Sequence, residues 1–220
     1  MSTHIEDYIK NIYKLHEEMD KVSTSSLAGA LNISAASVTD MIRKLSDRGL
    51  IRYEPYQGVE LTDRGRTMAL QTLRRHRLWE MFLVDFLGYT WDEVHEEAEK
   101  LEHITSENLE DRIDMALGYP THDPHGHPIP TKNGEIVEDD HPSLADLGFD
   151  ENGVVVRVHD TSPSLLQHMT TLGIRIGSRV TVLEIVEFDG SMRLRVDSDE
   201  VFVSRQVARN IFVDSGGENR

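Results

Sequence analysis

The chain has 220 residues, no cysteine and a formal net charge of −16 at neutral pH. The absence of cysteine excludes disulfide frameworks, thiolate metal sites and cysteine nucleophiles, and it fits a reducing cytosol. No apolar run is long enough to span a membrane, and the N-terminus lacks the hydrophobic segment of a signal peptide. We therefore expect a cytoplasmic protein with no membrane partner.

Acidic residues are concentrated in the middle of the chain. Residues 1–77 carry 12 Lys and Arg against 10 Asp and Glu, residues 78–150 carry 3 against 19, and residues 151–220 carry 8 against 10. A carboxylate-rich centre is suited to binding cations, whereas the N-terminal part is mildly basic. The low overall pI therefore does not exclude DNA as a partner.

The N-terminal third has the pattern of a winged helix-turn-helix. Apolar residues at helical spacing predict a first amphipathic helix over residues 4–19. A short helix over residues 25–31, a turn at Asn32-Ile33 and a second helix from residue 34 or 35 to 48, ended by Gly49, follow. Residues 50–53 and 59–61 alternate as two short strands around Pro55–Gly58 and predict a hairpin wing. Such a domain can instead serve only in protein interaction.

In a helix-turn-helix, the N-terminal part of the second helix enters the major groove of DNA. Hydroxyl groups there can bind bases or phosphates, an alanine methyl can contact a thymine methyl, and arginine binds phosphates. The groove-facing candidates are Ser34, Ala36, Ser37, Thr39, Asp40 and Arg43. Double-stranded DNA is the partner that this pattern predicts.

The central part offers two helices with possible metal ligands. A long helix over residues 63–87 places His76 and Glu80 one turn apart, where a surface hydrogen bond is the alternative to a metal site. A capping box at Thr90 predicts a helix over the next residues, and Ser106 offers the cap of a further helix. One face of the first of these helices carries two imidazoles and two carboxylates, on His95, Glu99, Glu102 and His103. These donors suit divalent first-row metals, with a solvated acidic face as the alternative.

Beyond the central helices the periodic pattern stops. Residues 118–143 are rich in proline, glycine and histidine and predict an irregular connection, in which solvated or loop-packing histidines are favoured over a metal cluster. Strands over residues 154–158, 179–187, 191–196 and 200–203, a hairpin turn at Asp189-Gly190 and a helix over 165–172 then predict a small β-barrel.

Five sequence blocks, taken together, resemble a known family. They are EDYIKNIYKL, the helix-turn-helix with a wing ending in ELTDRGR, RRHRLWE, VHEEAEKLEHITSE and HGHPIP. In this order and spacing they resemble the iron- and manganese-dependent repressors of the diphtheria toxin repressor family, in its three-domain form. The resemblance implies a mainly α protein with little β structure. Its domains would be a winged helix-turn-helix over residues 1–70, a helical metal-binding and dimerisation domain over 71–140, and an SH3-like (FeoA-like) β-barrel over 151–215.

The resemblance also implies two metal ions per subunit. The regulatory site would be formed by Asp7, Glu99, Glu102 and His103, and the ancillary site by His76, Glu80 and His95. Iron-responsive relatives add two ligands from the barrel, where this chain has Ser162 and Leu165, so Asp160 is the nearest substitute. Two-domain manganese members have a further carboxylate where this chain has Lys10, and we do not expect their binuclear arrangement here.

Two ligand positions favour manganese. Asp7 and Glu99 stand where iron-responsive relatives typically have methionine and cysteine, and replacing soft sulfur by carboxylate shifts preference towards Mn(II). The resemblance therefore implies a homodimeric Mn(II)-activated repressor of manganese uptake genes, with an Fe(II)-responsive repressor of iron homeostasis as the alternative. A helical carboxylate-histidine metalloenzyme is a more distant alternative. Such enzymes need Glu-x-x-His on two of four long helices, whereas the spacing here is Glu99-x-x-Glu102-His103. We expect no enzymatic activity.

Overall fold

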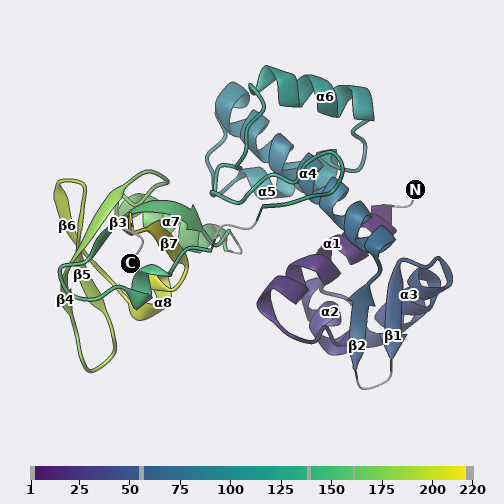
Figure 1. Ribbon diagram of the computed structural model, residues 1–220, viewed down its shortest axis with the longest axis horizontal. Coiled ribbons are helices and arrows are strands. Elements are labelled where there is room, and N and C mark those ends of the chain that lie inside the picture. Colours follow the sequence, from purple (N-terminus) through teal and green to yellow (C-terminus); the bar gives the residue numbers. More distant parts are fainter. Residues whose placement is uncertain (1–2, 55–56, 138–139, 161, 217–220) are drawn as a thin grey trace. The chain divides into compact units, whose positions relative to one another are not determined.

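The computed structural model describes residues 3–54, 57–137, 140–160 and 162–216. The chain divides into two compact units. Unit 1 comprises Met1–Trp79, Glu99–Met115 and Ile129–Val137, and unit 2 comprises Glu80–Ala98, Ala116–Pro128 and Glu138–Arg220. Among the described residues, no helix is both long and apolar enough to cross a membrane. Figure 1 labels the helices and strands.

Unit 1 begins with the predicted winged helix-turn-helix. Its elements are α1 (Thr3–Glu18), α2 (Thr24–Ala30), α3 (Ala35–Asp47), β1 (Ile51–Glu54) and β2 (Gly58–Leu61). The hydroxyl of Ser23 caps α2 by accepting from the backbone of Ser26, and Ser34 caps α3 in the same way through Ser37. Such caps satisfy backbone N–H groups that have no partner inside a helix. The turn of the wing includes Pro55 and Tyr56, which lie outside the described residues.

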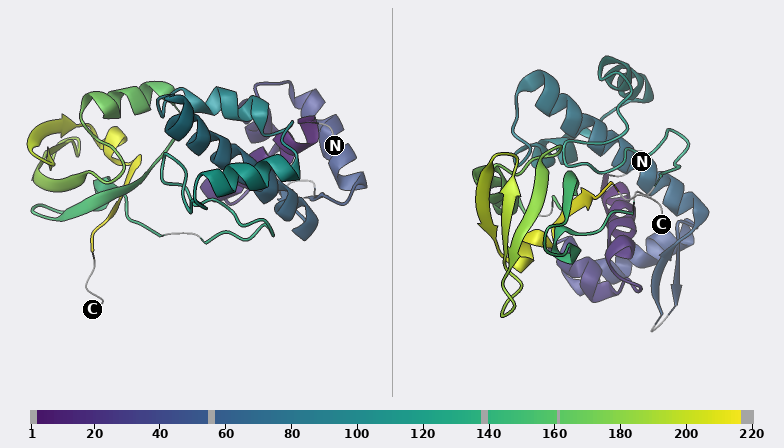
Figure 2. Two further views of the ribbon diagram at one scale, coloured as in Figure 1. Left: turned by 90° about the horizontal axis from the view of Figure 1, so that it is seen from above. Right: turned by 60° about the vertical axis from the view of Figure 1, so that its left-hand side comes forward.

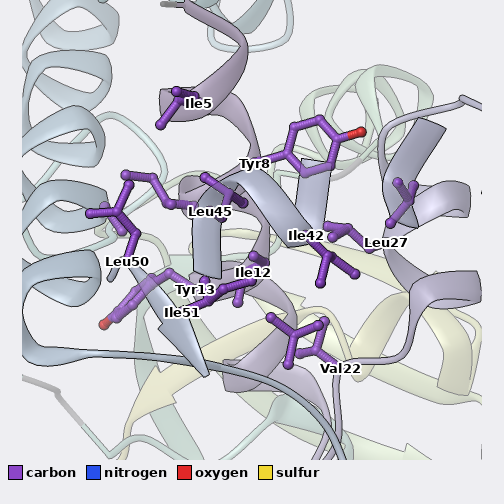
Figure 3. Close-up of a cluster of buried hydrophobic side chains, with 14 of the residues drawn as sticks. Ile5, Tyr8, Ile12, Tyr13, Val22, Leu27, Ile42, Leu45, Leu50 and Ile51 are labelled. Atoms are coloured by element: carbon purple, nitrogen blue, oxygen red, sulfur yellow. The ribbon is translucent and has the colours of Figure 1, made fainter. Parts of the chain in front are cut away.

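A single apolar core joins these elements. The side chains labelled in Figure 3 are all buried and come from α1, α2, α3, β1 and the segments just before α2 and β1, which supply Val22 and Leu50. Gly49 ends α3 with a φ of +65°, a conformation that glycine adopts without strain, and the chain then enters β1. The wing pairs antiparallel, with Ile51 opposite Leu61. An isolated bridge between Val22 and Val59 ties the wing to the segment before α2.

The central helices follow the prediction except at the two ends of α5. Helix α4 (Asp63–Leu87) has the predicted bounds, and α6 (Glu107–Ala116) begins after the predicted cap at Ser106. Helix α5 (Val94–Leu101) starts later than predicted, because the contact of Thr90 with Glu93 closes a separate turn before the helix.

Helix α5 also ends earlier than the predicted ligand face requires. Glu102 and His103 lie in the turn after Leu101, so they do not continue the helical face that carries His95 and Glu99. The prediction of one shared helical face was wrong, because the helix is only eight residues long.

Unit 2 contains an antiparallel five-stranded sheet, seen as a bent layer of green and yellow strands in Figure 2. Its strands are β3 (Asn152–Val158), β4 (Arg179–Ile185), β5 (Met192–Val196), β6 (Asp199–Val203) and β7 (Ile211–Asp214), in the order β6-β5-β4-β3-β7. The short helices are η1 (Leu144–Asp146), α7 (Pro163–Thr171) and α8 (Arg205–Ala208). The described residues between 118 and 143 contain no helix or strand, as predicted.

The sheet is bent but not closed into the predicted barrel. Bulges in β3 and β4 curve it, yet β6 and β7 remain its two edges. The free side of β7 pairs instead with the chain before η1, where Val213 donates its N–H to the carbonyl of Pro142 at 3.1 Å. The sequence prediction also missed β7, which is only four residues long.

Candidate metal centres and nucleic-acid interface

Unit 1 brings the four predicted regulatory ligands together. Asp7 comes from α1, Glu99 from α5, and Glu102 and His103 from the turn that follows α5. One possible ligand atom of each lies within 4.8 Å of the others. We call these four residues the regulatory cluster.

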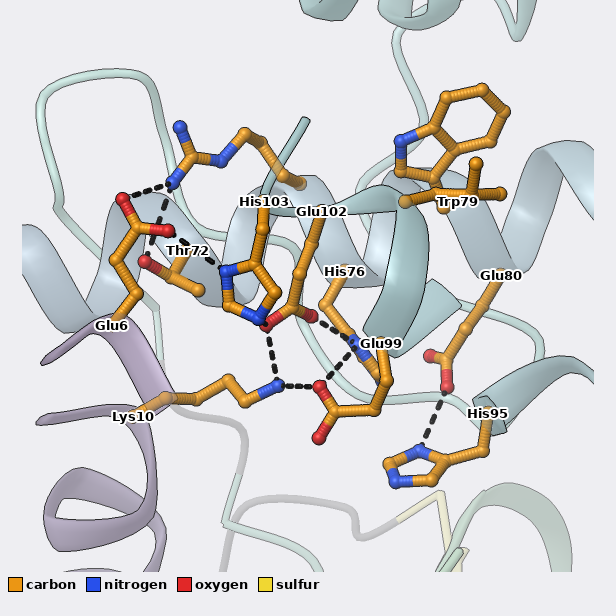
Figure 4. A network of polar contacts seen from close by, with 12 residues as sticks. Glu6, Lys10, Thr72, His76, Trp79, Glu80, His95, Glu99, Glu102 and His103 are labelled. Atoms are coloured by element: carbon orange, nitrogen blue, oxygen red, sulfur yellow. Dashed lines mark hydrogen bonds and ion pairs between the residues drawn. The ribbon is translucent and has the colours of Figure 1, made fainter. Parts of the chain in front are cut away.

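Glu102 is the most deeply buried member of this cluster. Its side chain has no exposed surface, and both of its oxygens have partners, as Figure 4 shows. Oε1 accepts a hydrogen bond from the Lys10 ammonium at 2.6 Å, and Oε2 lies 2.5 Å from Nδ1 of His76. Lys10 also donates to Oε2 of Glu99. Pairing of this kind is required, because an isolated buried carboxylate is strongly unfavourable.

His103 is held between two acidic residues of α1. Nδ1 lies 2.8 Å from Oε2 of Glu6, and Nε2 lies 2.7 Å from Oδ1 of Asp7 and 3.4 Å from Oε1 of Glu102. In the tautomer that donates its Nδ1 proton to Glu6, the Nε2 lone pair would be available to a metal ion held by the other ligands. This is the arrangement in which a carboxylate orients a metal-binding histidine.

Burial and neighbouring charges shift the pKa values of two groups at the regulatory cluster, Asp7 and Lys10. Burial raises the pKa of Asp7, and this outweighs the lowering by His103 and Lys10. For Lys10, burial alone would lower the pKa, but the carboxylates of Glu102 and Glu99 outweigh it and raise the pKa. The lysine is therefore held as a cation among the predicted ligands.

Unit 2 contains a second cluster, formed by Glu80, His125 and Asp160. One possible ligand atom of each lies within 4.8 Å of the others, and the side chains of Glu80 and His125 have no exposed surface. His95, also in unit 2, places Nδ1 3.4 Å from Oε1 of Glu80. The predicted ligand Asp160 therefore lies beside the predicted ligand Glu80. His76 belongs to unit 1, so the predicted triad of His76, Glu80 and His95 draws on both units and stays a prediction.

His125 is fixed by the loop around it. Its Nε2 lies 2.7 Å from the carbonyl of Trp91, and its own carbonyl accepts from the N–H of Val158 at 2.9 Å. Gly126 has a φ of +85°, and a Cβ there would come within 1.9 Å of the Val156 carbonyl. The glycine thus allows the loop to lie directly against β3, the strand that leads to Asp160.

Carboxylates also surround His125. Burial alone would lower its pKa, but Glu80, Asp123 and Asp160 outweigh burial and raise the pKa. Asp123 is itself buried, and its Oδ1 accepts from the backbone N–H groups of His125 and His127 at 2.8 and 2.9 Å. Asp123, His125 and His127 form a further group with possible ligand atoms within 4.8 Å.

The predicted DNA contacts lie along α3 and at its N-cap. All six of these side chains are exposed: Ser34, Ala36, Ser37, Thr39, Asp40 and Arg43. Two of their polar groups have local roles, since Ser34 caps the helix and the Thr39 hydroxyl donates to the carbonyl of Ala35. Arg43 lies 3.9 Å from Asp40, a distance at which an exposed pair contributes little stability and leaves the guanidinium accessible.

Three residues of these sites were not predicted as members. Glu6 had one signal, its place next to Asp7. Lys10 had none, because a lysine is by type expected at the surface even when its neighbours Ile9 and Ile12 are buried. The signal for His125 was its place in the HGHPIP block. We interpreted it as a loop residue because the sequence around it is irregular.

Three family models match successive parts of the chain. The iron dependent repressor N-terminal DNA binding domain matches residues 1–59, and the iron dependent repressor metal binding and dimerisation domain matches residues 62–131. The FeoA domain matches residues 143–215. Together the three models follow the order of domains that the sequence predicted.

Individual repressors are similar to the chain over different lengths. The iron-dependent repressor IdeR of Mycobacterium tuberculosis is 39% identical over 125 residues, which are 57% of this chain and 54% of that protein. The matched region thus spans about half the length of that relative. The diphtheria toxin repressor of Corynebacterium glutamicum is 31% identical over 189 residues, covering 81% of this chain and 82% of that protein.

Solved structures resemble the chain over almost its whole length. A manganese-dependent transcriptional repressor in complex with manganese has a TM-score of 0.89 and 42% identity, covering 96% of this chain and 99% of that chain. The manganese regulator SloR has a TM-score of 0.79 and 35% identity, covering 98% of this chain and all of the other.

Proposed function

Because the chain belongs to the diphtheria toxin repressor family, a family of DNA-binding repressors rather than enzymes, we propose that it is a metal-activated transcriptional repressor. Mn(II) is the proposed activator, and operator DNA of manganese uptake genes is the proposed target. The protein would act in the cytoplasm as a homodimer with two ions per subunit.

The donor set of the regulatory cluster carries this proposal. Three carboxylates and one imidazole meet there, and the chain has no cysteine that could supply a thiolate. Oxygen donors with a single nitrogen suit Mn(II), whereas softer ions gain more from sulfur. Asp7, Glu99, Glu102 and Nε2 of His103 would hold the ion, which would supply coordination bonds and neutralise negative charge.

The position of Asp7 connects this cluster to DNA binding. Helix α1 packs against α2 and α3 through the core that contains Ile9, Ile12, Leu27 and Ile42. A metal ion that joins Asp7 to the turn after α5 would therefore also hold the helix-turn-helix, including α3, in place. In a homodimer, two recognition helices must enter major grooves about 34–36 Å apart or at multiples of that distance. Metal and DNA then favour each other, because both select the same arrangement.

Charge gives a second reason for metal dependence. Residues 78–150 carry 19 Asp and Glu against 3 Lys and Arg, so this region repels itself. Cations bound by its carboxylates reduce the repulsion in addition to forming bonds. The second cluster, with Glu80, His125 and Asp160, is the proposed place of the second ion, together with the predicted ligands His76 and His95.

Exposed apolar side chains support the homodimer. Ile104, Leu109 and Met115 lie in and just before α6, and 76%, 40% and 58% of their surfaces are exposed. They fall within the match to a metal binding and dimerisation domain. Large apolar side chains that stay exposed are typical of surfaces that another protein covers.

An Fe(II)-responsive repressor is the second candidate, because the relatives from Mycobacterium and the matching family models are named for iron. The test measures binding of metal-free protein to DNA under anaerobic conditions, as a function of free Mn(II) and free Fe(II). The DNA is first selected from a random-sequence pool by the metal-loaded protein. Mn(II) should activate binding at physiological free concentrations. Activation by Fe(II) alone would reassign the sensor to iron, and equal DNA binding without any metal would overturn the proposal.

A further inference from the structure

Lys10 is an unusual residue to find inside a predicted metal site. It is among the largest fully buried side chains of the described chain, with 1% of its surface exposed. It lies one turn after Asp7 on α1, and its ammonium contacts Glu99 and Glu102, which follow about 90 residues later in sequence. Lysine is rarely fully buried unless it is paired.

The lysine and a metal ion would use the same oxygens. Oε1 of Glu102 lies 2.6 Å from Nζ of Lys10 and 3.4 Å from Nε2 of His103. This oxygen therefore faces both the ammonium and the imidazole that belongs to the regulatory cluster. Lys10 likewise contacts Oε2 of Glu99. A divalent ion held by these residues would share their lone pairs with the ammonium and would be repelled by its charge.

We propose that Lys10 is a tethered cation that holds the regulatory cluster together without metal and competes with the incoming ion for Glu99 and Glu102. The competition weakens metal binding and raises the free metal concentration at which the protein responds. The same contacts stabilise the metal-free fold, because they balance carboxylates that burial would otherwise leave uncompensated. This inference rests on the metal-sensing function proposed above.

The central experiment replaces Lys10 by methionine, which keeps an unbranched side chain and removes the charge. Mn(II) binding to metal-free protein without DNA is measured by calorimetry, in a Glu80→Ala background so that the regulatory cluster dominates. Lys10→Met should tighten Mn(II) binding about tenfold or more, the factor that corresponds to about 1.4 kcal/mol. Lys14→Met, the matched change one turn further along α1, should alter the dissociation constant less than about twofold.

Thermal unfolding provides an independent measurement. The metal-free Lys10→Met protein should melt several degrees below wild type, and saturating Mn(II) should raise its melting temperature by more than it raises that of wild type. If Lys10→Met does not fold without metal, Lys10→Gln and Lys10→Arg replace it. The glutamine variant should bind Mn(II) more tightly than wild type, whereas the arginine variant, which keeps the charge, should stay near the wild-type affinity.

The outcomes separate this inference from the proposed function. If wild-type protein binds neither Mn(II) nor Fe(II), both are overturned. If wild type binds metal and the neutral variants bind it equally or more weakly, the sensor function stands and the role of Lys10 as a competitor is overturned.

Discussion

The two acidic clusters differ in the cation that balances their carboxylates. In the regulatory cluster this role belongs to Lys10, whereas in the second cluster Glu80 and Asp160 lie around His125. A lysine stays charged across the physiological pH range, but the charge of an imidazole changes near neutrality. Metal binding at the second cluster should therefore displace a proton from the cation that balances it, whereas Lys10 stays charged when metal binds at the regulatory cluster.

Removing one carboxylate from each cluster should have the largest effect on the metal response. Glu99→Ala removes a predicted regulatory ligand and one partner of Lys10, and it should weaken metal-dependent DNA binding by about 100-fold or more, since even indirect supports of metal ligands are worth 10- to 100-fold. Glu80→Ala, the matched change in the second cluster, should shift the metal midpoint only several-fold. Both are measured as DNA binding against free Mn(II).

Size-exclusion chromatography and circular dichroism provide the control for these two variants. Each should remain folded and dimeric, because neither change removes an apolar contact. A full metal response in Glu99→Ala would show that the regulatory site lies elsewhere. A larger loss in Glu80→Ala than in Glu99→Ala would reverse the assigned roles of the two clusters.

Changing the donor atoms of the regulatory cluster should alter its metal preference without deleting a ligand. Asp7→Met combined with Glu99→Cys places a thioether and a thiolate in the regulatory cluster. These softer donors should raise the response to Fe(II) or Co(II) relative to Mn(II) by about tenfold or more. The measurement is DNA binding against each free metal in anaerobic buffer. Glu96→Cys introduces the same thiol on an exposed position of α5 and should leave the metal preference unchanged.

Local sequence patterns predicted several features of the central and N-terminal helices. The bounds of α4 and the caps at Ser34 and Ser106 follow from short-range signals, and the structure agrees with them. Helical spacing singled out Glu99, Glu102 and His103. The family resemblance added Asp7 and grouped the four as predicted regulatory ligands, which come from segments more than 90 residues apart. Spacing alone misled where a helix was short, since Glu102 and His103 lie beyond the end of α5.

The remaining features depend on contacts that no local pattern contains. Lys10 looks like a surface residue by type, and only its distant partners Glu99 and Glu102 explain its burial. His125 is buried because Gly126 lets its loop approach β3, a contact made by residues about 30 positions later. The sheet is not a closed barrel, because its edge strands β6 and β7 do not pair with each other and β7 pairs with the chain at Pro142 instead. Strand β7 is only four residues long, which is too short to predict from the sequence.

A change outside both clusters should weaken DNA binding without changing metal binding. Arg43→Ala removes an exposed cation from α3 and should weaken DNA binding about tenfold, while the slope of affinity against salt falls by about one. Its metal affinity without DNA should equal that of wild type, because α3 holds none of the predicted ligands. Titrations at several salt concentrations measure the slope, and Arg195→Ala on the exposed side of β5 is the control. Unchanged DNA binding by Arg43→Ala would remove this arginine from the interface.

A change in pH should affect the second cluster through the proton of His125. The pKa of His125 is raised in the folded protein, so its proton stabilises the metal-free fold at low pH, and this contribution is lost as the pH rises through the raised pKa. A histidine ligand must be neutral, and metal must therefore displace this proton below that pKa. Lowering the pH from 7.5 to 6.5 should weaken the second binding phase up to tenfold but shift the DNA-binding midpoint only about threefold, since the regulatory cluster dominates that response.

Calorimetry in buffers of different ionisation enthalpy counts the protons released. Wild type should release up to one proton more than His125→Gln in the second phase, and the two proteins should agree in the first. Equal proton release by both in the second phase would mean that His125 does not exchange its proton for metal. The difference between the two clusters, one balanced by a lysine and the other by a histidine, would then have no effect on metal binding.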